Sequence, residues 1–260
     1  MSQIDFGLQT QDLRLKTFFE TMNQIEFKIG AIRPVECFKE AWEIIKPQYW
    51  MLIGITLLGA MIGSATLYIL LGAMVCGIFY CYLKVLDGKK IDFEDLFRGF
   101  GFWLPGLIVT IFFIVPTLIF FAIAYLPLLI TILTKPNIGN DELWAIIGVN
   151  VVVDVIFSVV MVCFHTLLMF SYLLVVDKKL TAIKAMKTSA RAVWANLGGV
   201  AKLYGVGFLV SLGGMLVFCI GIYLTIPIVI AANTVAYRKI FPANENSNPD
   251  SPNPDNYQGI

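Results

Sequence analysis

Long apolar stretches without charged residues alternate along the chain with shorter polar segments. No charged residue occurs between Tyr49 and Leu83, between Trp103 and Leu133, or between Val155 and Val176. Each stretch exceeds the roughly 20 residues that an α-helix needs to cross the hydrocarbon core of a bilayer. The pattern therefore predicts an all-α, polytopic membrane protein.

Breaks inside the apolar stretches set the expected number of spans. As a single helix, residues 49–86 would reach about 57 Å at 1.5 Å per residue, which is too long for one crossing. Gly63 and Ser64 break this stretch, and the segment SLGG at 211–214 breaks residues 199–239 in the same way. We expect six spans, near 49–64, 67–86, 102–131, 142–176, 197–214 and 217–238.

Lysine and arginine predict the orientation of the spans, because cytoplasmic loops of membrane proteins are enriched in them. They gather before Pro47, between Lys84 and Arg98, and between Lys178 and Arg191. On the other side, the turns at 63–66 and 211–216 contain none, and the 134–141 loop contains only Lys135. Both termini are therefore predicted to be cytoplasmic. Residues 1–20 lack the apolar core of a cleavable signal peptide, so we expect the first span to direct insertion.

A short amphipathic segment precedes each pair of spans. The apolar stripes consist of Val35, Phe38, Trp42 and Ile45; of Phe93, Leu96, Phe97 and Phe100, with Asp92 as the expected N-cap; and of Ile183, Met186, Ala190 and Val193. Helices of this kind lie in the membrane interface. The sequence thus predicts an internal repeat of three helical hairpins, each preceded by a cytoplasmic amphipathic helix.

Three regions are expected along the chain. Residues 1–33 form a cytoplasmic N-terminal segment, and residues 34–240 form the six-span membrane domain. Residues 241–260 contain many Pro and Asn residues and almost no apolar ones. Such a composition cannot bury enough surface to offset the entropy of ordering, so a disordered cytoplasmic tail is predicted.

Composition agrees with a membrane location and limits the partners. The 260 residues are 58% hydrophobic and 14% charged, whereas soluble domains have about 25% charged residues. The net charge of +1 suggests no nucleic-acid partner. Membrane lipids are the expected partners, and a membrane-protein partner or a homo-oligomer stays open. Gly59 and Gly63 allow another helix to approach closely, whether that helix is internal or belongs to another subunit.

Polar residues interrupt the fourth span. At 100° per residue, Asn150, Asp154, Met161, His165 and Tyr172 lie within about 40° of one line along the helix, with Ser158 at its edge. We therefore expect this stripe to face the bundle. With the cytoplasmic boundary near Val175, Asp154 is expected near the outer interface and His165, the only histidine, near the midplane.

The third span contains candidate partners for this stripe. A hairpin of spans three and four predicts Thr110 beside His165, Thr117 beside Ser158 and Tyr125 beside Asn150. Such hydrogen bonds between helices contribute about 0.6 kcal/mol on average. Helix packing is the favoured explanation of the stripe. A path for protons or substrate is the first alternative, since ionisable groups inside membranes are commonly functional, and a catalytic site is the second.

Basic residues mark the third amphipathic segment. Lys184, Lys187 and Arg191 are spaced i, i+3, i+7, which places them on one side of a helix. We expect them to contact lipid head groups. Ordinary anchoring to the cytoplasmic interface accounts for them, and a dedicated site for an anionic lipid or a partner is the alternative.

Motifs for enzymatic chemistry do not occur. The chain has no phosphate-binding loop, no H-E-x-x-H and no C-x-x-C pair, and its cysteines lack metal-ligand spacing. The acidic group Asp87, Asp92, Glu94 and Asp95 is interpreted as part of a solvated loop. We therefore expect no enzymatic activity, no metal and no cofactor.

The C-terminal spans resemble a known family. An A-x-x-x-S-x-R helix leads into one span, and the next span contains G-x-x-x-x-x-P and ends in a Tyr-Arg pair. The matching residues are Ala185, Ser189, Arg191, Gly221, Pro227, Tyr237 and Arg238. This pattern is similar to the YciC-type proteins and to the membrane domain beside some glycerophosphodiester phosphodiesterases, a set of uncharacterised bacterial integral membrane proteins. The resemblance covers about residues 34–240 and implies an inner-membrane location.

Together these features predict a non-enzymatic, multi-pass protein of the bacterial cytoplasmic membrane. A structural, assembly or envelope-homeostasis role is favoured. The alternative is a small transporter or channel for a small solute or lipid that uses the polar stripe of span four.

Overall fold

A computed structural model describes residues 27–66, 68–135, 139–216 and 221–242, and within these ranges every regular element is a helix. In chain order these elements are α2 (Pro34–Ile45), η1 (Lys46–Gln48), α3 (Tyr49–Ala65), α4 (Leu71–Leu86), α5 (Glu94–Phe97), η2 (Arg98–Phe102), α6 (Trp103–Thr134), α7 (Asn140–Leu167), α8 (Ser171–Lys178), α9 (Ala182–Ala195), α10 (Leu197–Met215) and α11 (Gly221–Ile240). Of the predicted N-terminal segment and the predicted disordered tail, only 27–33 and 241–242 lie within the described residues.

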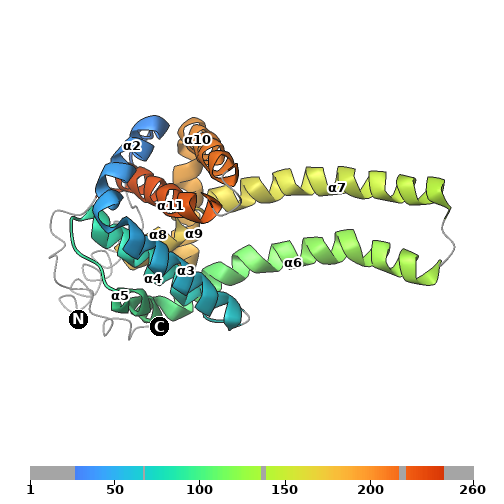
Figure 1. Cartoon of the computed structure of the whole chain (residues 1–260), viewed down its shortest axis with the longest axis horizontal. Coiled ribbons are helices and arrows are strands. Elements are labelled where there is room, and N and C mark those ends of the chain that lie inside the picture. The colour runs from blue at the N-terminus through green and yellow to red at the C-terminus, as the bar shows by residue number, and fades with distance from the viewer. Residues whose placement is uncertain (1–26, 67, 136–138, 217–220, 243–260) are drawn as a thin grey trace, which may run out of the picture.

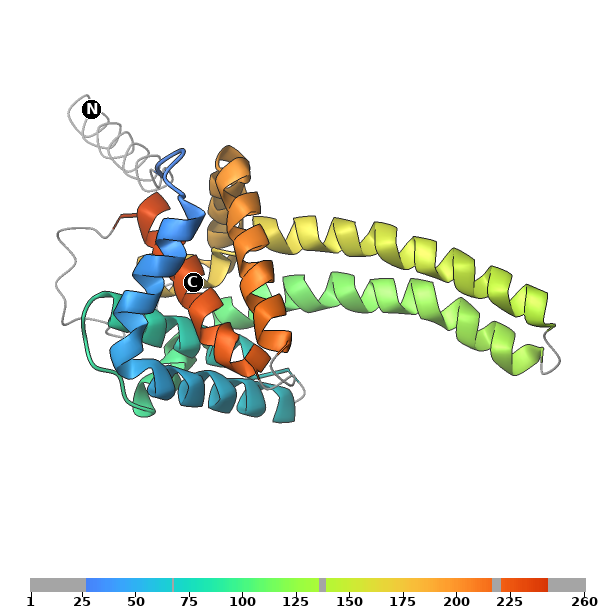
Figure 2. The same cartoon turned by 45° about the horizontal axis from the view of Figure 1, so that its top comes forward.

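The helices form a packed head and one long hairpin that projects from it (Figures 1 and 2). The hairpin consists of α6 and α7, and the remaining helices form the head. The start of α6 belongs to the head, because Val109 and Thr110 are buried there. Farther along, large apolar side chains such as Leu118 and Ile123 are 60% and 64% exposed.

Membrane-length helices account for most of the predicted spans. Five stretches are long and apolar enough to cross a bilayer: Pro34–Ala65, Glu94–Thr131, Asn140–Lys178, α10 and α11. The remaining predicted span is α4, an apolar helix of 16 residues. It is about 24 Å long, less than the 30 Å hydrocarbon core. The fold is therefore that of a multi-pass helical membrane protein.

The fourth predicted span is two helices and not one. α7 ends at Leu167, α8 begins at Ser171, and the turn at 168–170 separates them. This segment has neither Pro nor Gly, so the chain itself contains no signal for a break. The cause is a contact from α9, described below.

Packing in the head centres on α4 and α11. α4 contacts α3, α6 and α8, and it crosses α5 and η2, while α11 packs against α2 and α10. At the crossing of α4, a Cβ atom built on Gly77 would lie 1.9 Å from the carbonyl oxygen of Leu96. Gly59 and Gly63 of α3 are buried against Ile78 and Leu71, so their face is internal.

Each amphipathic segment has both buried and exposed positions in its apolar stripe. In α2, Ile45 is buried together with Cys37 and Ala41, whereas Val35 and Trp42 are exposed. In the other two segments, Leu96, Met186 and Val193 are buried, and Phe93, Phe97, Phe100 and Ile183 are exposed. The exposed members are the ones that would meet lipid at a membrane interface.

Candidate functional site

The polar stripe of α7 lies against α6. Asn150, Asp154 and His165 are partly buried, whereas valines on either side of them are exposed. Ser158, at the edge of the stripe, is exposed. Tyr172 belongs to α8, beyond the turn, so it is part of the head and not of the hairpin.

Hydrogen bonds between α6 and the stripe follow a different register from the expected one. The Tyr125 hydroxyl donates to Asp154 Oδ2 at 3.0 Å, and Thr110 Oγ1 lies 2.9 Å from the Tyr172 hydroxyl. The other expected residues bond within their own helices: Asn150 donates to the carbonyl of Ile146, and Thr117 donates to that of Phe113. The partner of Tyr125 is thus four positions, about one helical turn, beyond the expected residue, and that of Thr110 is seven positions, about two turns, beyond it.

His165 lies in an aromatic setting where the hairpin meets the head. Its ring is 4.9 Å from that of Phe113, centroid to centroid. Within the described residues, its Nε2 atom is buried without a hydrogen-bond partner, as is Asp154 Oδ1. Asp154 and His165 are eleven positions apart, about 17 Å along the helix axis. They therefore do not form a single site.

Ser189 of α9 holds the turn between α7 and α8. Its hydroxyl donates to the carbonyl of Leu167 at 2.8 Å and accepts the N–H of Phe170 at 3.1 Å. These are backbone groups that a continuous helix would pair internally, and Ser189 satisfies them where the helix breaks. Ser189 and Ala185 are fully buried, whereas Arg191 is exposed. The A-x-x-x-S positions of the motif thus have a packing role.

Ser189→Ala is expected to lower the free energy of unfolding by about 1–3 kcal/mol, because it leaves the buried Phe170 N–H without a partner. Denaturation in detergent micelles measures this change. Ser64→Ala is the matched control, since the Ser64 hydroxyl is exposed and bonds within its own helix. Equal stability of the two variants would show that Ser189 does not hold the turn.

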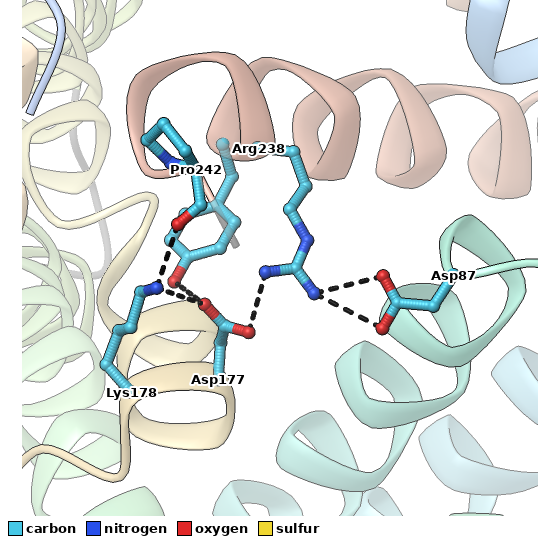
Figure 3. Close-up of polar contacts among 6 residues, drawn as sticks. Asp87, Asp177, Lys178, Arg238 and Pro242 are labelled. Carbon is cyan, nitrogen blue, oxygen red and sulfur yellow. Dashed lines mark hydrogen bonds and ion pairs between the residues drawn. The ribbon is translucent and has the colours of Figure 1, made fainter. Parts of the chain in front are cut away.

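An ion cluster joins the ends of three helices in the head (Figure 3). Arg238 of α11 donates from Nη1 to Asp177 Oδ1 of α8 at 2.8 Å, and from Nη2 to Asp87, just after α4, at 3.2 Å. The Tyr237 hydroxyl donates to Asp177 Oδ2 at 2.7 Å. Lys178 lies 3.5 Å from the same carboxylate and donates to the carbonyl of Pro242. We call Asp87, Asp177, Lys178, Tyr237 and Arg238 the ion cluster.

The predicted solvated acidic loop is wrong at Asp95. Asp95 is buried and pairs with Lys84 at 2.7 Å and with Arg98 at 3.4 Å. Its carboxylate also accepts the N–H of Asp92 at 2.9 Å, and α5 has no side-chain cap from Asp92. Asp87 belongs to the ion cluster. Asp95 pairs with Lys84 of α4 and with Arg98 of η2, and Asp87 pairs with Arg238 of α11. These ion pairs join neighbouring helices.

Two of the cluster's acids follow similar sequences. Residues 82–87 read YLKVLD and residues 172–177 read YLLVVD, so each Asp follows the same pattern of Tyr, Leu and Val. In both, the Tyr lies five positions before the Asp. This likeness was the available signal for pairing Asp87 and Asp177 with one shared cation.

Exposed cations cover the outer face of α9. Lys184, Lys187 and Arg191 are all exposed, as expected for residues that meet lipid head groups. Trp194 on the same helix is 72% exposed. Aromatic and basic residues in this combination are typical of a membrane–water interface.

Cysteines and metal ligands give no further site among the described residues. Cys37, Cys76 and Cys81 are buried free thiols and Cys163 is an exposed one, while Cys219 lies outside the described ranges. No group of three His, Cys, Asp or Glu side chains arranged for a metal occurs in the described part of the chain.

Comparison with models of protein families, with curated proteins and with solved structures finds no match to this chain. The similarity to the YciC-type proteins therefore stays a prediction from the motif residues.

Proposed function

We propose that this chain is a non-enzymatic scaffold of the bacterial cytoplasmic membrane, with a structural, assembly or envelope-homeostasis role. One observation carries the proposal: the projecting part of the α6–α7 hairpin exposes large apolar side chains such as Leu118, Ile123, Val152 and Val159, while Tyr125 bonds to Asp154 between the two helices. A projecting two-helix element of this kind suits contact with other membrane proteins.

The polar stripe supports packing more than transport. A transporter would need a cavity lined by Asn150, Asp154 and His165. The cleft of about 540 Å³ in the head is lined by residues within 29–36 and 195–202, and these three side chains are not part of its lining. Asp154 is bonded to Tyr125 across the hairpin, as expected of a side chain that fixes two helices.

We further propose that the head is a ring of three related units, with six spans and cytoplasmic termini. The second helix of each hairpin packs on the amphipathic segment of the next unit: α4 on α5 and η2, and α8 on α9. α11 packs on α2, which closes the ring. The similar sequences at 82–87 and 172–177 support the repeat.

Photocrosslinking tests the scaffold role. A photoreactive residue at Val152 or at Val159, which are 58% and 60% exposed on α7, is expected to form adducts with a defined membrane protein in cells. Phe208 of α10, at 67% exposed, is the control on the head. Adducts with lipid alone at all three sites would reject the proposal.

A second candidate function is transport, and a separate observation favours it. Asp154 Oδ1 and His165 Nε2 are buried without hydrogen-bond partners among the described residues. Such atoms inside a membrane can take part in moving a proton or a polar solute.

Asp154→Asn combined with His165→Ala separates the two candidates. For a scaffold, the double variant is expected to restore the growth or envelope phenotype of a deletion strain as well as the wild type does. Its free energy of unfolding is expected to fall by an amount of order 1 kcal/mol, the value of one or two interhelical hydrogen bonds. Loss of complementation with unchanged stability would favour transport.

A further inference from the structure

α2 and α10 begin side by side (Figures 1 and 2). A cleft lies between the residues at these two helix starts. Its volume is about 540 Å³, and residues within 29–36 form one wall while residues within 195–202 form the other. This cleft is separate from the polar stripe of α7 and from the ion cluster.

Asn196 fixes the position of the two walls. Its side chain is 5% exposed. Its Oδ1 accepts the N–H of Gly30 at 2.7 Å, and its Nδ2 donates to the carbonyls of Lys28 and Ala192 at 3.2 and 2.9 Å. The segment before α2 is therefore hydrogen-bonded to the junction of α9 and α10. These bonds hold the two walls of the cleft in place.

The charges around the cleft favour an anion. Arg33 and Lys202 line it as cations, and Glu36 is the one acid among its lining residues. Glu36 accepts Arg33 Nη1 at 3.2 Å in an exposed contact, so these three side chains leave the cleft a net charge of +1. Beyond the cleft, no Asp or Glu occurs in the sequence from Lys178 to Phe241. Arg191 lies one helical turn before Ala195, so the basic face of α9 leads into the cleft.

The rim of the cleft is apolar. Ile29, Val35 and Leu197 line it and are 72%, 58% and 50% exposed, and the neighbouring Trp194 is 72% exposed. A cationic cleft with an apolar rim, on a helix that leads into the membrane, matches a molecule with a phosphate at one end and hydrocarbon at the other. Basic clusters beside membrane helices bind anionic lipids in this manner.

We propose that this cleft binds the head group of an anionic phospholipid, with the phosphate between Arg33 and Lys202 and the acyl chains along the apolar rim.

Retention of phosphatidylglycerol during native mass spectrometry tests the charge requirement. Protein taken from nanodiscs with equal phosphatidylglycerol and phosphatidylcholine is expected to retain the former. Arg33→Gln with Lys202→Gln is expected to reduce that preference about thirtyfold, given roughly 1 kcal/mol for each cation near the surface. Lys39→Gln with Lys90→Gln removes the same charge from exposed positions elsewhere and is expected to leave the preference unchanged.

A steric pair of variants tests the cleft without altering charge. Gly198 lines the cleft and has open space where a side chain would begin, so Gly198→Leu is expected to fold and to fill the cleft. Gly205, also in α10 with open space, provides the control Gly205→Leu. We expect the first variant alone to lose lipid retention.

Three outcomes would overturn the proposal. Equal loss of phosphatidylglycerol in both charge variants would mean general electrostatic attraction. Equal loss in both leucine variants would mean that the cleft is not the site. A thermal shift of the detergent-solubilised protein with inorganic phosphate alone, removed by Arg33→Gln with Lys202→Gln, would mean a site for free phosphate and not for lipid.

Discussion

Arg238→Ala is expected to lower the free energy of unfolding by about 3 kcal/mol. The Arg238 and Asp177 side chains are only 17% and 13% exposed, and removing one partner of a buried ion pair leaves the other charge without compensation. The expected loss lies at the lower end of the usual range because Tyr237 and Lys178 still contact Asp177. Denaturation in detergent micelles, followed by circular dichroism, measures it.

Two further variants make this result specific to the buried pair. Asp87→Asn is expected to cost less than about 1 kcal/mol, because the Asp87 side chain is 49% exposed and water screens its contact with Arg238. Arg238→Met with Asp177→Asn is expected to recover part of the loss, because both members of the buried Arg238–Asp177 pair are then uncharged. If Arg238→Ala and Asp87→Asn are equally stable, the ion cluster does not hold the head together.

Gly77→Ala is expected to cost about 3 kcal/mol or more, or to prevent folding. The added Cβ would lie 1.9 Å from the carbonyl oxygen of Leu96 and 2.9 Å from its carbonyl carbon. Both are backbone atoms, so α4 and α5 would have to separate, and overpacking of this kind costs at least 1–3 kcal/mol. Thermal unfolding in detergent, together with the yield of folded protein, reports the effect.

Gly205→Ala is the matched control for this prediction. Nothing lies within 4 Å of a Cβ built at Gly205, so the change is expected to be neutral or to stabilise the helix by up to about 1 kcal/mol. A Gly77→Ala protein as stable as Gly205→Ala would show that α4 and α5 are not in close contact.

The positions of the helices could be predicted because a helix that crosses lipid needs about 20 consecutive, mostly apolar residues. Each predicted span coincides with an apolar helix to within a few residues, apart from the turn inside the fourth. The direction of the polar stripe also followed from helical periodicity alone. A helix has one most polar side, and Asn150, Asp154 and His165 occupy it.

Contacts between distant segments could not be predicted in this way. The turn at 168–170 is held by Ser189, some twenty residues later, and no local residue signals it. Likewise, the sequence does not distinguish Asp95 from a solvated loop residue, because its contacts with Lys84 and Arg98 appear only in the fold. Which members of an apolar stripe pack against other helices, such as Leu96, and which stay exposed, such as Phe97, also depends on distant segments.

The contact of α11 with α2 has a consequence for biosynthesis. α2 is among the first described helices to leave the ribosome, and its packing partner α11 is the last, with the N–H of Lys28 donating to the carbonyl of Ile240 at 2.9 Å. The insertion machinery must therefore release α2, or a chaperone must shield it, before its packing partner α11 has been made. Nascent chains arrested before Gly221 are expected to be sensitive to proteases at α2, and translation of the final helix is expected to end that sensitivity.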